Sequence, residues 1–329
     1  MGSVKMRFLG TTVGAAMYAR FVVPHYHSFV RVNGGDEQRV ELPDCELDGE
    51  FVADPFLFAR CGDVWLFFEG MYKGRGDRGV AKGVIGCMRK DGKKWCYMGV
   101  ALEEHWHLSY PQVFEDGGAV YMIPETAQSG EVALYEAKEF PMKWRKAAVL
   151  LRGRYVDSTL LRKDGFYYMV ATPESATLRP ELWRSVSLLG PWERHPASGN
   201  VSSSLSLRRN GGAFLEEAGR VYRIAQDCDG DYGIRLFMVP VDGVSPDLYS
   251  EGVPEVLSEA VSWPQPRRHH TYNRILAGGD LLEVVDRHYN TIRGPVPFLS
   301  AVAWYLVDGM RYVFRTAFRT HDSEQGASR

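Results

Sequence analysis

The stretch Asp54-Pro-Phe-Leu-Phe-Ala-Arg-Cys-Gly62, followed by Val64-Trp-Leu-Phe-Phe-Glu69, decides the fold, because it is the first of five copies of one pattern. Each copy has an apolar strand, a glycine turn and a second apolar strand, which together predict a β-hairpin. The other copies begin at Tyr110, Asp157, Gly211 and His270. A third strand candidate follows each hairpin, and in several copies a fourth comes after it. Four strands recurring about every 50 residues are typical of a β-propeller.

We therefore predict an all-β fold, a five-bladed β-propeller with four-stranded antiparallel blades around a central channel. Residues 51–315 form this single propeller, and residues 316–329 form a polar tail. Residues 1–50 form an N-terminal segment that supplies a ring-closing strand, for which we favour Ser28–Asn33. A β-sandwich is the alternative, but it does not require the same hairpin five times.

The amino-acid composition excludes several classes of function. The 329 residues carry 39 Lys and Arg against 41 Asp and Glu, a net charge of −2, which disfavours nucleic acid or an anionic membrane as partner. No apolar run is long enough to span a membrane. The five cysteines lack metal-ligand spacing and are typical of reduced thiols, so we expect a cytoplasmic protein without a cofactor. Secretion is the alternative, because residues 8–19 resemble a weak signal-peptide core.

Polar residues recur at two positions of the repeat, where the strands otherwise are apolar. In a propeller, the start of the first strand and the end of the second strand meet at one mouth of the channel, so we expect these side chains to converge there. Converging carboxylates shift one another's pKa, as acid–base chemistry requires. We predict catalytic roles for Asp54, Glu125 and Asp157, and substrate binding by Glu69, His107, Tyr110, Arg209, Asn210, Gln226, Asp227, His269, His270 and Asp286.

Each of these assignments has a structural alternative. Asp54 and Asp157 also suit turn caps that accept backbone hydrogen bonds. The pair His269-His270 has no third ligand at a useful spacing, so we expect no metal site. Arginines such as Arg209 suit contacts with an anion or a sugar.

Several stretches resemble the propeller region of glucosamine inositolphosphorylceramide transferases and of related stand-alone bacterial proteins. They include Ala53-Asp-Pro-Phe-Leu, His107-Leu-Ser-Tyr-Pro111, Val120-Tyr-Met-Ile-Pro-Glu125 and Tyr222-Arg-Ile-Ala-Gln-Asp227. In the plant transferases this propeller lies beside a separate glycosyltransferase domain, for which 329 residues leave no room. The resemblance therefore implies the propeller alone, with a glycosyltransferase as a partner.

The chain is more distantly similar to five-bladed propeller glycoside hydrolases, which use a first-blade Asp as base or nucleophile and a later Glu as acid. This similarity implies that Asp54 acts as base, with Glu125 or Asp157 as acid and the other tuning its pKa. Ser109-Tyr110 stands where those hydrolases carry a second Asp, which is a departure from their pattern.

Three hypotheses follow for a funnel that binds a glycan or another small polar molecule. The first is glycoside hydrolase-like acid/base catalysis by paired carboxylates. The second is a non-catalytic glycan-recognition module working beside a glycosyltransferase. The third is a repurposed enzyme that cyclises or isomerises a specialised metabolite, with His107, Tyr110, His269 and His270 as acid–base groups. The sequence favours an enzyme and leaves the binding module open.

Overall fold

The computed structural model describes residues 22–73, 82–175, 179–202, 204–229, 233–261, 263 and 268–292. Contacts divide the chain into a unit of residues 26–288 and a second unit of the two chain ends, residues 1–25 and 289–329. The description below concerns the first unit. The expected polar tail, residues 316–329, and the end of the expected propeller lie outside the described residues.

The described elements are almost all strands, joined by tight turns as the glycine content predicts. The first twelve strands after the N-terminal pair are β3 (Leu47–Arg60), β4 (Asp63–Tyr72), β5 (Gly83–Asp91), β6 (Lys94–Leu102), β7 (Ser109–Asp116), β8 (Ala119–Glu125), β9 (Glu131–Glu139), β10 (Lys143–Arg152), β11 (Tyr155–Lys163), β12 (Phe166–Pro173), β13 (Glu181–Ser185) and β14 (Glu193–Arg194).

The C-terminal strands are β15 (Arg209–Asn210), β16 (Leu215–Glu217), β17 (Arg220–Gln226), β18 (Leu236–Val244), β19 (Tyr249–Glu251), β20 (Glu255–Val256), β21 (Tyr272–Ala277) and β22 (Asp280–Ile292). The N-terminal pair is β1 (Val22–Val32) and β2 (Gln38–Arg39). The described helical segments are short: η2 (Ala127–Ser129), η3 (Ser198–Asn200), η4 (Leu205–Leu207) and α2 (Leu257–Ala260). None of them is long and apolar enough to cross a bilayer.

The described strands form four hydrogen-bonded sheets. Two have four strands, in the orders β10-β9-β8-β7 and β11-β12-β13-β14, and one has six strands around β17 and β18. The fourth has eight strands in the order β21-β22-β1-β3-β4-β5-β6, with β2 added to β1. The sequence predicts five separate sheets, whereas the hydrogen bonds between the described strands define four. The physical reason is one parallel bridge, Tyr26 to Phe51, which joins β1 to β3.

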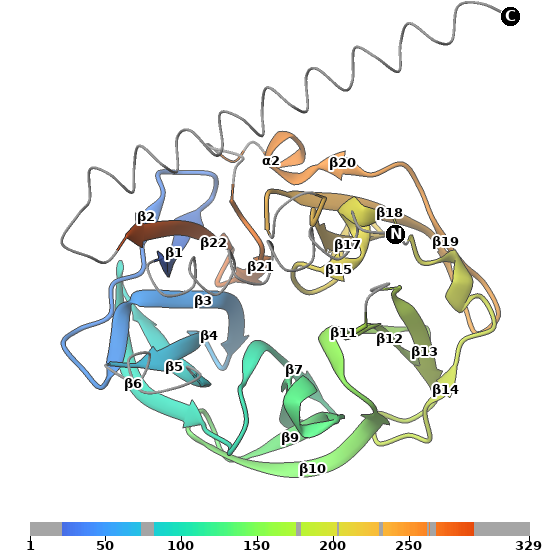
Figure 1. Ribbon diagram of the computed structural model, residues 1–329, viewed down its shortest axis with the longest axis horizontal. Helices are drawn as coiled ribbons and strands as arrows, with labels where there is room; N and C mark the ends of the chain where they lie inside the picture. Colours follow the sequence, from blue (N-terminus) through green and yellow to red (C-terminus); the bar gives the residue numbers. More distant parts are fainter. Residues whose placement is uncertain are drawn as a thin grey trace, which may run out of the picture. The chain divides into compact units, whose positions relative to one another are not determined.

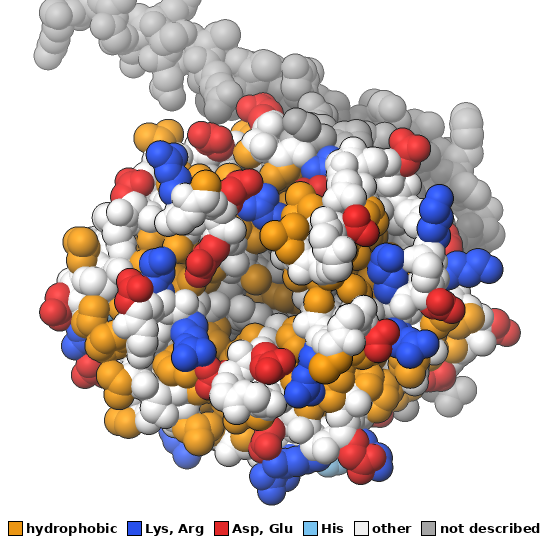
Figure 2. All heavy atoms as spheres, turned by 180° about the vertical axis from the view of Figure 1, so that it is seen from behind, with side chains coloured by type: hydrophobic (Ala, Val, Ile, Leu, Met, Phe, Trp, Pro, Cys, Tyr) orange, Lys and Arg blue, Asp and Glu red, His pale blue; other side chains and the backbone are white. Residues whose placement is uncertain are grey.

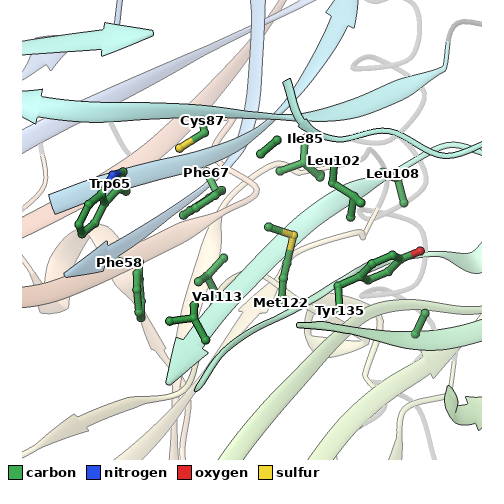
Figure 3. Close-up of a cluster of buried hydrophobic side chains, with 13 residues drawn as sticks. Phe58, Trp65, Phe67, Ile85, Cys87, Leu102, Leu108, Val113, Met122 and Tyr135 are labelled. Atoms are coloured by element: carbon green, nitrogen blue, oxygen red, sulfur yellow. The ribbon is translucent and has the colours of Figure 1, made fainter. Parts of the chain in front are cut away.

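The sheets follow one another around a common centre in chain order (Figure 1). Hydrophobic side chains fill the space between neighbouring sheets. Figure 3 shows one such cluster, in which Phe58, Trp65 and Phe67 of the eight-stranded sheet pack against Val113 and Met122 of the sheet β10-β9-β8-β7. Aromatic side chains bury large areas, which explains why a chain of stacked sheets has an aromatic content of 12%.

Residues far apart in sequence close this unit. Arg31 of β1 and Glu283 of β22, 252 positions apart, are both buried. The guanidinium donates from Nε to Glu283 Oε2 at 2.6 Å and from Nη2 to Oε1 at 2.9 Å. The Tyr272 hydroxyl donates to the same Oε1 at 2.7 Å. This network holds the N-terminal strand against the last described strand.

Candidate functional site

The repeat positions singled out by the sequence share one backbone feature. Asp54, Tyr110 and Asp157 have positive φ angles of 45°, 49° and 48°. A register shift also falls at each of these positions, in the pairings of β3 with β4, β7 with β8 and β11 with β12. A left-handed backbone conformation is uncommon for residues other than glycine and costs energy. Because it recurs at three equivalent positions, it is a regular feature of the repeat. A register shift of this kind is a β-bulge, which changes the direction in which the side chain at the bulge points.

Asp54 belongs to a buried ion-pair network with His270 and Asp286. The Nδ1 atom of His270 lies 2.5 Å from Asp286 Oδ2, and its Nε2 lies 3.5 Å from Asp54 Oδ1. Asp54 also accepts hydrogen bonds from the Thr271 hydroxyl at 2.5 Å and the Tyr110 N–H at 3.2 Å. Asp286 accepts from the backbone N–H groups of Asp54, His270 and Thr271.

In the part of the chain that the structure describes, Asp54, His270 and Asp286 are the one group of three side chains with potential metal-ligand atoms within 4.8 Å of one another. Their hydrogen bonds argue against a cation there. Each carboxylate oxygen already accepts from an N–H or O–H group or pairs with the imidazole. The protein itself thus holds both carboxylates, Asp286 by the imidazole and three N–H groups and Asp54 by Thr271 and Tyr110.

A second ion pair lies beside Glu125. Arg209 donates two hydrogen bonds to the two oxygens of Asp157, one of them from Nη2 to Oδ1 at 2.9 Å. Its Nη2 is also 3.9 Å from Glu125 Oε2, which accepts from the Asp157 N–H at 3.2 Å. The bidentate pair fixes both partners and turns the guanidinium toward Asp157 rather than Glu125.

Glu69 pairs with His107 at 3.3 Å, between Oε1 and Nε2. The Nδ1 atom of His107 accepts the N–H of Gly83 at 2.9 Å, so a neutral imidazole carries its proton on Nε2, toward Glu69. A Cβ on Gly83 would lie 2.4 Å from the Leu108 carbonyl oxygen, so this approach of the backbone requires glycine. The pair is therefore locked by the local backbone.

The carboxyls of the site hold their protons to different degrees. Burial, followed by the negative charge of Asp157, raises the pKa of Glu125 to about 8, although the charge of Arg209 lowers it. Burial and the charge of Asp54 raise the pKa of Glu69 well above its ordinary range. Burial would also raise the pKa of Asp286, but the charge of His270 and the hydrogen bonds that Asp286 accepts together outweigh it, and the net shift is downward. The site thus combines ionised and protonated carboxyls at neutral pH.

The other predicted binding residues lie at different depths. The Tyr110 hydroxyl is fully buried and bonds to Thr159 and to the backbone of Gly212, so it ties sheets together. Asn210 donates to the Asp157 carbonyl, and Gln226 donates to the Asn210 carbonyl. These two hydrogen bonds fix the backbone of Asp157 and of Asn210.

Two further predicted residues are engaged outside this group. Asp227 binds Arg235 at 2.8 Å and accepts the Asp229 N–H, as a turn residue does. His269 accepts a hydrogen bond from Arg287 at 3.2 Å. Burial and the charge of Arg287 lower the pKa of His269 to about 4, so it stays neutral at physiological pH.

Sequence reasoning missed Tyr26 and Thr271. Tyr26 lies on β1 and its ring stacks on His270 at 4.9 Å and on His288 at 4.8 Å. Tyr26 precedes the first repeat copy, and Thr271 directly follows His270, the first residue of the fifth copy. The run His25-Tyr-His27 was the available signal, because three ring side chains there alternate along a strand.

The charge state of His270 predicts how stability changes with pH. Burial by itself lowers the pKa of His270, but the charges of Asp286 and Asp54 outweigh it and raise the pKa from 6.5 to about 9. A folded-state pKa above the unfolded one contributes stability that is complete below pH 6.5 and is lost as pH rises through 9. The raised pKa of Glu125 acts in the same direction between pH 4.5 and 8.

We therefore expect the urea midpoint of the wild type to fall from pH 6.5 to 9, with a loss of up to about 3 kcal/mol from His270. In His270→Gln the slope against pH is shallower, and Glu125→Gln removes the part due to that carboxyl. A wild-type midpoint that stays level or rises over this range would contradict the assigned charges.

The fold defines the class of protein: it is all-β and propeller-like, and solved glycoside hydrolases share it. A family 117 glycoside hydrolase of Zobellia galactanivorans superposes with a TM-score of 0.52 at 14% identity, covering 79% of this chain and 90% of that one. An exo-1,5-α-L-arabinanase from a bovine ruminal metagenomic library gives a TM-score of 0.51 at 11% identity, covering 70% and 93%. At these identities the likeness concerns the fold alone.

Residues 40–288 match the family described as Glucosamine inositolphosphorylceramide transferase 1, N-terminal, and the chain belongs to this family. Glucosamine inositolphosphorylceramide transferase 1 of Arabidopsis thaliana is 35% identical over 254 residues, which is 73% of this chain and 32% of the relative. The protein of the same name in Oryza sativa subsp. japonica is 36% identical over 251 residues, 72% and 33%. The chain thus spans about a third of the length of these relatives. The resemblance noted in the sequence is confirmed.

Proposed function

We propose that this site binds a sugar or another polyhydroxylated molecule and carries out glycoside hydrolase-like acid/base chemistry on it. One observation carries the proposal: Glu125 is a carboxyl of the site whose side chain is 14% exposed and whose pKa is raised to about 8. A general acid needs a proton at working pH and access to the leaving group. The glycan named in the relatives, a glucosamine-bearing inositol lipid, indicates the class of ligand.

In this proposal Glu125 is the general acid and Asp54 the general base. Asp157 tunes the acid, because its charge is the second cause, after burial, of the raised pKa of Glu125. Arg209 orients Asp157 and limits that shift. His270 and Asp286 hold Asp54 in place. Burial raises the pKa of Asp54 as well, and the positive charge of His270 opposes this shift, so in this proposal His270 is what keeps Asp54 able to act as a base.

A second candidate function, glycan recognition without catalysis, has its own supporting observation. Both oxygens of Asp54 already accept hydrogen bonds from the protein, which suits a structural carboxylate better than a base. The relatives are named transferases, and this chain covers a third of their length. In this alternative the propeller would position a glycan for a glycosyltransferase.

We also propose that residues 26–288 form five blades. Four hydrophobic clusters join successive sheets. A fifth lies within the eight-stranded sheet, between the strands β1 and β22 and the strands β3, β4 and β5, as between two blades. Splitting that sheet at its single parallel bridge gives a blade β21-β22-β1-β2 and a blade β3-β4-β5-β6. The N-terminal strand β1 would then be the ring-closing strand. The face in Figure 2 is hollowed at its centre, as such a ring requires.

The two functions are separated by Glu125→Gln. We expect the wild type to release 4-nitrophenol from at least one 4-nitrophenyl glycoside of a panel, and the variant to lose at least about 100-fold in kcat, the lower end of general acid catalysis. Calorimetric binding of glucosamine and myo-inositol should change little, because the amide keeps the shape of the protonated carboxyl. Glu115→Gln is the matched control, since Glu115 lies in the same sheet with its side chain 46% exposed and pairs with Arg60.

Sugar binding without turnover by the wild type would contradict catalysis and favour the recognition module. Turnover that survives Glu125→Gln unchanged would remove Glu125 from the mechanism.

A further inference from the structure

The carboxyls of the site differ in how many hydrogen bonds the protein already makes to them. Asp54, Asp157 and Asp286 each accept bonds at both oxygens from backbone or side-chain donors. They therefore have little capacity left for a ligand, whatever their role in setting charge.

Three other side chains keep spare hydrogen-bonding capacity. Glu125 uses one oxygen, on the Asp157 N–H, and Glu69 has His107 as its partner at a long 3.3 Å. The Tyr26 hydroxyl makes no hydrogen bond within the described ranges. Groups that the protein leaves unsatisfied in a polar site are the ones that a ligand can satisfy.

Tyr26 is held rigidly in this position. Its ring packs between His270 and His288 and meets Phe51 edge-on at 5.0 Å. Its Cα pairs with Phe51 in the bridge between β1 and β3, three residues before Asp54. His270 in turn contacts Asp54 and Asp286. A ring fixed on three sides can present its hydroxyl without losing side-chain entropy on binding.

The electrostatics agree with this geometry. Burial and then the charges of Asp286, Glu69 and Asp54 raise the pKa of Tyr26 above its ordinary value. The hydroxyl therefore stays protonated at all physiological pH values. The backbone places Glu69 near Tyr26, because Tyr26 pairs with Phe51 and Glu69 pairs with Ala53, two residues further along β3.

We propose that Tyr26 and Glu69 form a ligand subsite that binds a hydroxyl group of the sugar whose reacting end lies at Glu125. The Tyr26 hydroxyl can donate and accept, and Glu69 in its protonated form can do the same, which matches the hydroxyl of a neutral polyol. An anionic group would meet the charges of Asp54 and Asp286, and Arg209 of the described residues is already bonded to Asp157. The subsite rests on the proposed sugar-binding function and deepens it.

The inference also gives the N-terminal strand a role in binding. Tyr26 precedes residues 40–288, the part of the chain that matches the family. A residue outside the shared region would then set what the shared carboxylates can bind.

The test is isothermal titration of myo-inositol and glucosamine into the wild type, Tyr26→Phe, Glu69→Gln and a control. Tyr26→Phe keeps the stacked ring and removes one hydroxyl, so we expect Kd to rise about 5- to 10-fold, the loss of one hydrogen bond. Glu69→Gln should weaken binding to a similar extent. Tyr97→Phe is the control, because the Tyr97 hydroxyl donates to Glu46, a residue away from the site.

Unchanged affinity of both Tyr26→Phe and Glu69→Gln for a probe that the wild type binds would overturn the subsite and leave the proposed function standing. Absence of binding by the wild type would overturn the proposed function and the subsite together. Equal weakening by Tyr97→Phe would show a general effect of tyrosine loss and would also overturn the subsite. Melting temperatures of all variants separate weak binding from loss of fold.

Discussion

Gly212→Ala is expected to leave a large fraction of the protein unfolded at 37 °C. A Cβ at position 212 would lie 1.9 Å from the carbonyl oxygen of Tyr272, and the φ angle of 146° is one that other residues rarely adopt. Neither the β21 backbone nor Gly212 can move away cheaply, because the Gly212 N–H and carbonyl both bond to the Tyr110 hydroxyl, at 2.7 and 2.8 Å. The clash and the backbone strain together should cost about 4 kcal/mol or more. That is much of the stability of an ordinary domain.

Circular dichroism during thermal unfolding measures this effect. Gly199→Ala is the matched control, since Gly199 is exposed and a Cβ there meets nothing within 4 Å. We expect the control to stay within about 0.5 kcal/mol of the wild type. A Gly212→Ala protein as stable as the control would mean that the approach of Gly212 to Tyr272 is not as described.

Arg31→Met should destabilise the protein by about 3 to 5 kcal/mol, because it leaves the buried carboxylate of Glu283 without its cation. The guanidinium also donates to the Val261 carbonyl at 2.5 Å and lies over the Trp263 ring at 4.2 Å, so the variant loses these contacts as well. The pair joins β1 to β22, and its loss releases the N-terminal strand. We expect urea unfolding to show the loss as a lower midpoint.

A double-mutant cycle separates the ion pair from the lost packing. Arg31→Met combined with Glu283→Leu removes both charges, so the double variant should be less destabilised than the sum of the single ones by at least about 1 kcal/mol. Arg152→Met is the exposed control, because the Arg152 side chain is 82% exposed where it pairs with Glu131, and should cost less than about 1 kcal/mol. Additive effects at positions 31 and 283 would contradict a strong buried pair.

The strands were predictable because their signals are local. The second hairpin, expected over residues 110–118 and 120–125, appears as β7 (Ser109–Asp116) and β8 (Ala119–Glu125). Alternating apolar residues and glycine turns act over a few positions, and no distant contact is needed to read them. The number of sheets was harder to predict, because a single bridge between Tyr26 and Phe51 merges two groups of strands into one sheet.

The repeat register also predicted that several candidate carboxyls occupy equivalent positions of their strands. Asp54 and Asp157 share a left-handed backbone at equivalent strand positions, and Glu69 and Glu125 pair with the residues just before Asp54 and Tyr110. A repeat carries this information because equivalent positions in stacked units face the same side. Arg209, predicted only as a binding residue, proved to be the partner that fixes Asp157.

The sequence by itself determined the strands, the turns and the position of acidic residues within each repeat copy, since each depends on residues close together in the chain. Only the tertiary structure decided which carboxyl keeps its proton and which is held by a cation. Thr271 and Asp54 are 217 positions apart, and Arg31 and Glu283 are 252 apart. A pKa depends on burial and on charges within a few ångströms, and those distances exist only once the ring of sheets has closed.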